Sequence, residues 1–250
     1  MSGHSRWSQI KRKKGKADVQ RGKLFSKILR EITVAAKNGG GDPKANMRLK
    51  AAIESAKEAN MPQDNIKRAV QKGTGELPGE AYEEITYEGY APGGVAVLVQ
   101  VVTDNRNRTG PEIRRTFEKQ GGNMGSAGSV GWMFERTGII QVDAEKIAED
   151  DLMAKALDAG ATDMRRAEKA FEITTTPAEM DLVREALTKA GVPVLEAQVT
   201  WVPKSLVRVE SKDAASVLRL IEALEELDDV QSVYANYDIP DEVLEAIAAA

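Results

Sequence analysis

Positively charged side chains are the residues of this chain with the clearest chemistry. Five of them fall within six residues near the start of the chain: Lys11, Arg12, Lys13, Lys14 and Lys16. Cations at this density neutralise the phosphates of a nucleic acid and release its counterions. Such contacts supply affinity without reading the base sequence. A solubilising tail is the alternative explanation of the same charge.

The basic character continues beyond this arm. We predict that the nucleic-acid-binding set also contains Arg21, Lys23, Lys27, Arg30, Arg48, Lys67 and Arg68. Residues 1–75 hold 18 Lys and Arg against 6 Asp and Glu, whereas residues 76–250 hold 17 against 33. This split predicts a basic region that faces a polyanion and an acidic body. Trp7 lies inside the arm, where its ring either stacks on a base or packs against helices.

A second anion-binding candidate lies between a predicted strand and a predicted helix. Arg106 and Arg108 occupy this place, where free backbone N–H groups attract phosphate; a capped surface loop is the alternative. The glycine-rich stretch from Gly121 to Gly131 resembles a nucleotide loop only superficially. It follows a helix and precedes a strand, which is the reverse of the dinucleotide-binding order. We predict that it is a flexible connector.

Catalytic chemistry has little support in the sequence. His4 is the only histidine, and the chain has no cysteine, so thiolate metal sites, disulfides and cysteine nucleophiles are excluded. Acidic groups at 149–151 and 225–229 are predicted to be solvated surface. We therefore predict a protein that is not an enzyme and has no metal, cofactor or small-molecule substrate. An acid-only, metal-dependent nuclease is the weaker alternative.

The sequence also restricts the compartment. No apolar run reaches the length of a membrane helix, and the charged start lacks the apolar region of a secretory signal. The absence of cysteine suits a reducing cytoplasm. We predict a cytoplasmic protein without a membrane partner; a transit peptide is the alternative explanation of the acid-poor start.

The elements that position these residues begin with three helices in the first 75 residues. Apolar side chains recur there at helical spacing. Glycines at 39–41 are predicted to end the first helix. Asp42, followed by Pro43, is predicted to cap the second helix. The third is predicted to open at Pro62 and to close at Gly73.

The rest of the 250-residue chain predicts α/β structure, in keeping with two or three domains. Strands are predicted at 84–90, 95–103, 132–135, 139–142, 170–175, 194–202, 206–210 and 230–238. Helices are predicted at 109–120, where Thr109 and Glu112 form a capping box, and at 145–159, 178–190 and 213–227. Split β-α-β units of this kind are typical of ferredoxin-like sandwiches.

Several motifs together resemble the YebC-type family of probable transcriptional regulatory proteins. They are GHSRW, IKRKK, FSKILREI, GGGDPKAN, NMPQDNIKRAVQKG, EGYAPGGVAVLV, TDNRNRT and GSVGWMF. The resemblance covers nearly the whole chain. Arg12 and Lys13 depart from it, because members often carry a histidine there.

The resemblance implies an α+β fold: an N-terminal three-helix domain with a basic arm, then two ferredoxin-like α/β domains, one inserted into the other. The expected domains are residues 1–75, residues 80–131 with 203–240, and the inserted residues 132–202.

The resemblance also implies a DNA-binding regulator of transcription, with residues 11–23 and the helical domain as nucleic-acid candidates. Mitochondrial relatives are regarded as translational activators, so RNA or the ribosome is the alternative partner. A protein-interaction adaptor that uses the acidic face is a further alternative. Because the chain begins at GHSRW, we expect a bacterial cytoplasmic protein rather than a mitochondrial precursor.

Overall fold

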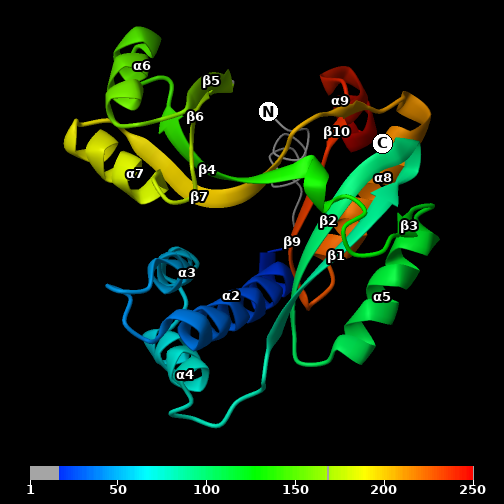
Figure 1. Cartoon of the computed structure of the whole chain (residues 1–250). Helices are drawn as coiled ribbons and strands as arrows, with labels where there is room; N and C mark the ends of the chain where they lie inside the picture. The colour runs from blue at the N-terminus through cyan, green and yellow to red at the C-terminus, as the bar shows by residue number, and fades with distance from the viewer. Residues whose placement is uncertain (1–16, 168, 250) are drawn as a thin grey trace. The chain divides into compact units, whose positions relative to one another are not determined.

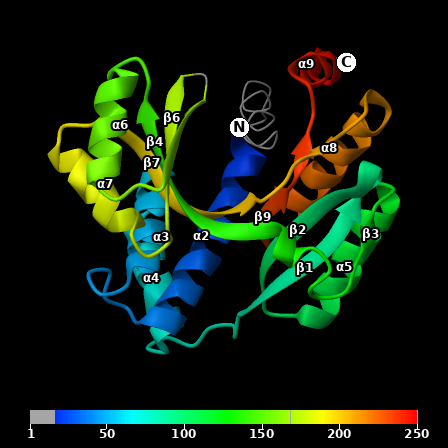
Figure 2. The same cartoon turned by 45° about the horizontal axis from the view of Figure 1, so that its top comes forward.

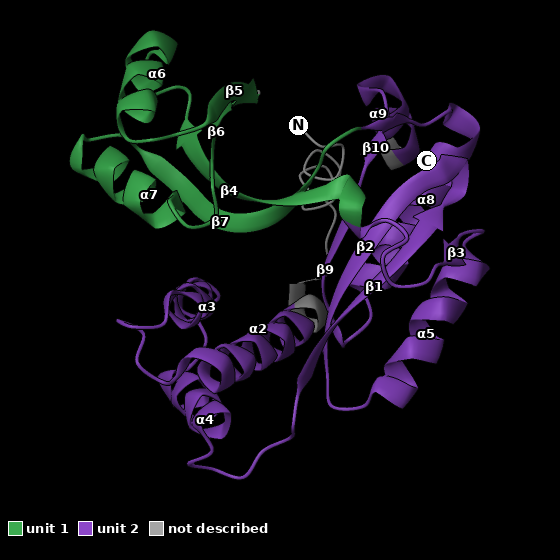
Figure 3. Ribbon diagram, in the orientation of Figure 1, with its two compact units in different colours: residues 1–2, 132–205 green, residues 3–131, 206–250 purple. Residues whose placement is uncertain are grey.

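The computed structural model describes residues 17–167 and 169–249 (Figure 1). Within these, residues 132–205 form one compact unit, and the segments on either side of them form the other (Figure 3). We call them the inserted unit and the main unit. The predicted α+β class, with N-terminal helices followed by antiparallel sheets, is confirmed. In the part of the chain that the structure describes, no helix has the length and apolar character needed to cross a membrane.

Three helices open the main unit: α2 (Ala17–Gly39), α3 (Met47–Glu58) and α4 (Gln63–Thr74). Their shared core contains Ile32, Leu49 and Ile66, all of which are buried. The first helix ends as predicted, since Gly40 follows it with a φ of 82°. This left-handed conformation is readily available only to glycine.

The cap of the second helix differs from the prediction. Asn46, not Asp42, is its N-cap: the Asn46 Oδ1 atom accepts from the Leu49 N–H at 3.0 Å. The Asn46 Nδ2 atom also donates to the Ala35 and Gly40 carbonyls, each at 2.8 Å. A carboxylate has no donor, so Asp42 cannot join the two helices in this way. Its side chain accepts from the Lys44 N–H at 2.9 Å in the preceding turn.

The end of the third helix was also predicted wrongly. The helix α4 runs past Gly73 to Thr74, and Gly75 closes it with a φ of 82°. A Cβ at Gly73 would lie only 2.3 Å from the carbonyl oxygen of Thr33 in α2. This glycine therefore permits a close approach of two helices.

An antiparallel sheet in the order β3-β1-β2-β9 forms the second part of the main unit. Its strands are β1 (Glu83–Ala91), β2 (Val95–Thr103), β3 (Asn123–Met124) and β9 (Val230–Ala235), with the 3-10 turn η1 (Pro92–Gly94) between β1 and β2. Two helices, α5 (Arg106–Lys119) and α8 (Ser211–Glu225), share a core with one face of this sheet (Figure 2). That core contains Val97, Val99, Phe117 and Leu218. A short parallel pair, β8 (Val207–Arg208) with β10 (Tyr237–Asp238), and the helix α9 (Asp241–Ala249) complete the unit.

Two boundaries in this sheet differ from the prediction. The helix α5 begins at Arg106, three residues before Thr109, with Asn105 as its N-cap. The strand predicted at 230–238 is two strands in different sheets, β9 and β10. Asn236 separates them, and its Oδ1 atom accepts from the Ala96 N–H at 2.7 Å.

The inserted unit has the order β4-α6-β5-β6-α7-β7. Its elements are η2 (Gly131–Met133, at the entry), β4 (Phe134–Asp143), α6 (Glu149–Asp158), β5 (Asp163–Ala167), β6 (Ala170–Thr175), α7 (Met180–Lys189) and β7 (Val194–Pro203). The strand order β5-β6-β4-β7, antiparallel throughout, is ferredoxin-like. Ile140, Leu152, Phe171 and Leu187 lie in a core that only this unit supplies.

Two strand predictions in this unit were wrong. Residues 132–135 and 139–142 were predicted as separate strands, but β4 is continuous because Arg136 and Thr137 pair with β7. The strand β5 was missed. The charged side chain of Arg165 interrupts the alternation of apolar and polar residues by which a strand is predicted. In the folded protein, Arg165 forms an ion pair at 2.6 Å with Glu172 on the neighbouring strand.

Candidate nucleic-acid interface

The basic arm lies outside the described residues. Lys11, Arg12, Lys13, Lys14 and Lys16 belong to it, as do His4 and Trp7. Their predicted contact with nucleic acid therefore stays a prediction. The remaining predicted cations fall into two groups, one held by partners within the protein and one exposed.

Three cations of α2 contact the end of α8 and the turn that follows it. Lys23 and Lys27 donate through Nζ to the carbonyls of Glu226 (3.0 Å) and Glu225 (2.7 Å), and Arg30 donates to the carbonyl of Asp228. The last carbonyls of a helix lack intrahelical donors, and the helix dipole makes this end negative. The row of cations therefore caps α8 and joins α2 to the α/β part of the main unit. Burial lowers the pKa of Lys27.

A buried carboxylate lies at the same junction. Asp229 is only 4% exposed, and its Oδ2 atom accepts from Thr109 (2.6 Å), Arg108 (2.7 Å) and Thr103 (3.1 Å). Arg30 lies 3.4 Å from the other oxygen. Burial opposes the charged form, but these hydrogen bonds outweigh it, and the pKa of Asp229 lies below its usual value. We call these five residues the Asp229 cluster.

The cluster changes the interpretation of two sequence features. The acidic group at 225–229 was predicted to be solvated surface, which is wrong for Asp229. Arg108 was predicted to hold a phosphate, but its guanidinium contacts two carboxylates, those of Asp229 and Asp104 (2.9 Å). Arg106, the other phosphate candidate, is exposed and forms no ion pair within the described ranges.

Arg48 is also held by partners within the protein. Its guanidinium contacts Glu31 of α2, with Nε–Oε1 at 2.7 Å, and Glu84 of β1, with Nη2–Oε1 at 2.6 Å. Both contacts are bidentate, a geometry that suits the planar guanidinium. Arg48 therefore joins three elements of the main unit.

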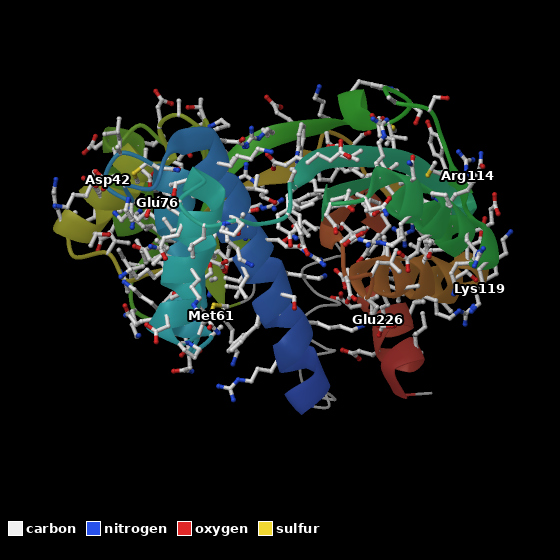
Figure 4. The ribbon with its side chains drawn as sticks, turned by 90° about the horizontal axis from the view of Figure 1, so that it is seen from below. Asp42, Met61, Glu76, Arg114, Lys119 and Glu226 are labelled. Carbon is white, nitrogen blue, oxygen red and sulfur yellow. The ribbon has the colours of Figure 1, made fainter. Side chains whose placement is uncertain are left out.

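Three exposed cations lie together on α4. Lys67, Arg68 and Lys72 are exposed, whereas Ile66 and Ala69 face the helical core. Met61 and Glu76 mark the two ends of this helix in Figure 4. Counting only residues 17–167 and 169–249, none of the three cations has an acidic partner. We call them the α4 cations.

Arg21 is exposed as well, on α2. Its guanidinium lies 5.7 Å from the centre of the Phe25 ring. This cation–π contact is within the usual range of about 6 Å. Arg21 therefore keeps its charge in contact with solvent.

The glycine-rich stretch is a fixed loop, and the prediction of a flexible connector was wrong. The Glu88 carboxylate accepts from three backbone N–H groups, those of Gly128 (2.8 Å), Val130 (2.6 Å) and Gly131 (2.7 Å). Burial opposes ionisation, yet these bonds hold the pKa of Glu88 below its usual value. The clamp fixes the backbone immediately before the inserted unit.

Acidic clusters were the remaining candidates for chemistry. Among the described residues, no group of three or more His, Asp or Glu side chains is arranged to hold a metal ion. The nuclease alternative therefore has no such cluster of three metal ligands in this part of the chain.

Sequence models of two parts of one family match this chain. The TACO1/YebC protein N-terminal domain matches residues 5–76, and the TACO1/YebC second and third domain matches residues 82–237. The chain belongs to the TACO1/YebC family. Within the family, a relative from Dictyoglomus turgidum is 54% identical over 249 residues, covering 99% of this chain and 100% of the relative. One from Pelotomaculum thermopropionicum is 57% identical over 243 residues, covering 96% and 100%. Both are named probable transcriptional regulatory proteins.

A solved structure agrees with the fold. The crystal structure of a conserved hypothetical protein from Aquifex aeolicus aligns with a TM-score of 0.82 at 54% sequence identity. The alignment covers 92% of this chain and 95% of that protein. The family fold therefore extends over nearly all of the described residues.

Proposed function

We propose that this protein is a non-catalytic regulator of gene expression that docks on nucleic acid through residues 1–75, as a DNA-binding regulator of transcription. The observation that carries the proposal is the exposed set of α4 cations, Lys67, Arg68 and Lys72, which have no acidic partner among the described residues. The regulatory names of the relatives support the same role. We place this activity in the cytoplasm.

The contrast between cations that bind other parts of the protein and cations that remain exposed supports this docking surface. Lys23, Lys27 and Arg30 bind the end of α8 and the turn that follows it, and so fix the helical part on the α/β part. The α4 cations make no such contact and project from a helix whose opposite face is buried. Phosphate contacts made by such side chains set the position of a protein on a nucleic acid, whereas contacts to base edges provide specificity.

The test measures how salt weakens binding to a labelled duplex. One variant changes Lys67, Arg68 and Lys72 to Gln. A charge-matched control changes Lys146, Lys189 and Lys212 to Gln, three lysines that form ion pairs with neighbouring carboxylates. Each lost phosphate contact lowers the log–log salt slope by ~0.9, so the α4 variant should lose about 2 to 3. A slope equal to that of the control would show that α4 is not the docking surface.

Phosphate contacts alone do not distinguish transcription from translation, because RNA carries the same backbone charge. Binding is therefore compared among duplex DNA, structured RNA and ribosomes at one salt concentration. Preference for a duplex supports the transcription role, and preference for ribosomes supports a translation factor. Absence of salt-dependent binding to all three supports the adaptor alternative. Magnesium-dependent cleavage of a labelled strand would overturn the assignment as a protein that is not an enzyme.

A further inference from the structure

The helix α5 gathers the cations of an otherwise acidic region. Between Lys72 and Arg136 the chain has five Lys and Arg residues, and all five lie on this helix: Arg106, Arg108, Arg114, Arg115 and Lys119. Residues 76–131 and 206–250 together hold 8 Lys and Arg against 19 Asp and Glu. Positive charge in the α/β part of the main unit is therefore concentrated on one element.

The geometry of α5 places three of these cations in solvent. Thr109, Ile113 and Phe117, spaced four residues apart, are buried on the side that faces the core. Arg114, Arg115 and Lys119 are exposed. Figure 4 shows Arg114 and Lys119 on the outer side of the helix. Arg115 and Lys119 are one turn apart and share a face.

These three cations differ from Arg108, which two carboxylates hold. Although Glu112 and Glu118 lie on the same helix, none of the three forms an ion pair with any residue that the structure describes. The helix dipole favours a cation in the last turn, such as Lys119. Its effect falls off within one turn, so it does not account for Arg114 and Arg115.

We propose that α5 is a second phosphate-contacting surface, which binds the backbone of the same nucleic acid that residues 1–75 hold. This inference rests on the proposed function. A polyanion is repelled by the acidic surface around α5, so a strip of unpaired cations is the part of this region that it can approach. From Arg106 to Lys119 the helix rises ~20 Å at 1.5 Å per residue. One DNA strand carries about six phosphates over that length, at ~3.4 Å each.

The experiment uses the full chain and a labelled duplex. One variant changes Arg114, Arg115 and Lys119 to Gln. It is compared with the Lys67, Arg68 and Lys72 variant and with the charge-matched Lys146, Lys189 and Lys212 control. We expect the α5 variant to lower the salt slope by about 2 to 3 and the affinity at 0.1 M salt by on the order of a hundredfold or more. The control should stay close to the unchanged protein.

A second variant separates charge from structure. Changing Arg114 and Arg115 to Lys keeps the positive charge, so it should keep most of the affinity, and the thermal unfolding midpoints of all variants should agree. If the α5 variant binds like the control while the α4 variant weakens, the α5 inference is wrong and the proposed function stands. If only the α5 variant weakens, α5 is a contact and the proposed α4 surface is wrong. If neither weakens, both are wrong.

Discussion

At the scale of single residues, the Asp229 carboxylate contacts two hydroxyls and two guanidinium groups at the junction of α2 with the α/β part. Changing it to Asn removes the charge that faces Arg30 and Arg108 and leaves both cations without that partner. Hydrogen bonds to charged groups contribute about 1.5–3 kcal/mol. Because Arg108 is 49% exposed, solvent screens its ion pair with Asp229. We therefore expect the free energy of unfolding to fall by an amount near the lower of these values.

Chemical denaturation measures this loss as the free energy of unfolding. The neighbouring exposed residue provides the control, since Asp228→Asn removes one charge without touching the cluster's carboxylate. Equal stability of the two variants would show that the Asp229 cluster does not hold the junction together.

The Glu88 clamp predicts a pH dependence of stability. The pKa of Glu88 is lowered in the folded protein, so its contribution is present above the unfolded pKa of ~4.3 and is lost as the pH falls through the folded value. Glu88→Gln should lower the free energy of unfolding by about 1–3 kcal/mol at neutral pH, and the difference from the unchanged protein should shrink below pH ~4.

Amide hydrogen exchange at Gly128, Val130 and Gly131 provides a local measurement of the same clamp. Exchange at these three groups should become faster in the Glu88→Gln variant, while the exposed Glu58→Gln control should leave it unchanged. Unaltered exchange would mean that the loop holds its conformation without the carboxylate.

At the scale of elements, the packing of α4 on α2 depends on Gly73. Alanine favours a helix interior by ~1 kcal/mol over glycine, but a Cβ here would meet the Thr33 carbonyl oxygen at 2.3 Å and the Ala36 Cβ at 2.7 Å. Overpacking of this kind costs about 1–3 kcal/mol. Gly73→Ala should therefore destabilise the protein in thermal unfolding.

Gly22→Ala in α2 is the matched control. A Cβ at Gly22 meets no described atom within 4 Å, so this change should stabilise the helix by roughly 0.5–1 kcal/mol. Stabilisation by both changes would contradict the close approach of α4 and α2.

At the scale of the whole molecule, we propose that residues 132–205 form a domain that folds independently. Its core, with Ile140 and Phe171, contains no residue of the main unit. The strand β7 extends to Pro203, which pairs with Phe134, so a fragment must continue past residue 202. Expressed alone, residues 132–205 should show a cooperative thermal transition by circular dichroism. A fragment without a transition would show that this unit needs the main unit to fold.

The sequence by itself determined the features that depend on near neighbours. The sequence predicted the helices α6, α7 and α8 to within a few residues. The motif Ala91-Pro92-Gly93-Gly94 predicted the hairpin of β1 and β2. The charge split and the family motifs predicted the basic N-terminal region and the α+β class, because charge, periodicity and motif identity are properties of the chain itself.

The tertiary structure alone decided which cations have partners. Arg108 and Asp229 are 121 residues apart in sequence, and Lys27 meets the Glu225 carbonyl across 198. No local pattern distinguishes such a pair from two solvated charges. The same holds for Glu88 and the Gly131 N–H, 43 residues away. A long-range ion pair forms only when two elements pack, so a cation held by a carboxylate and one that remains exposed have the same appearance in the sequence.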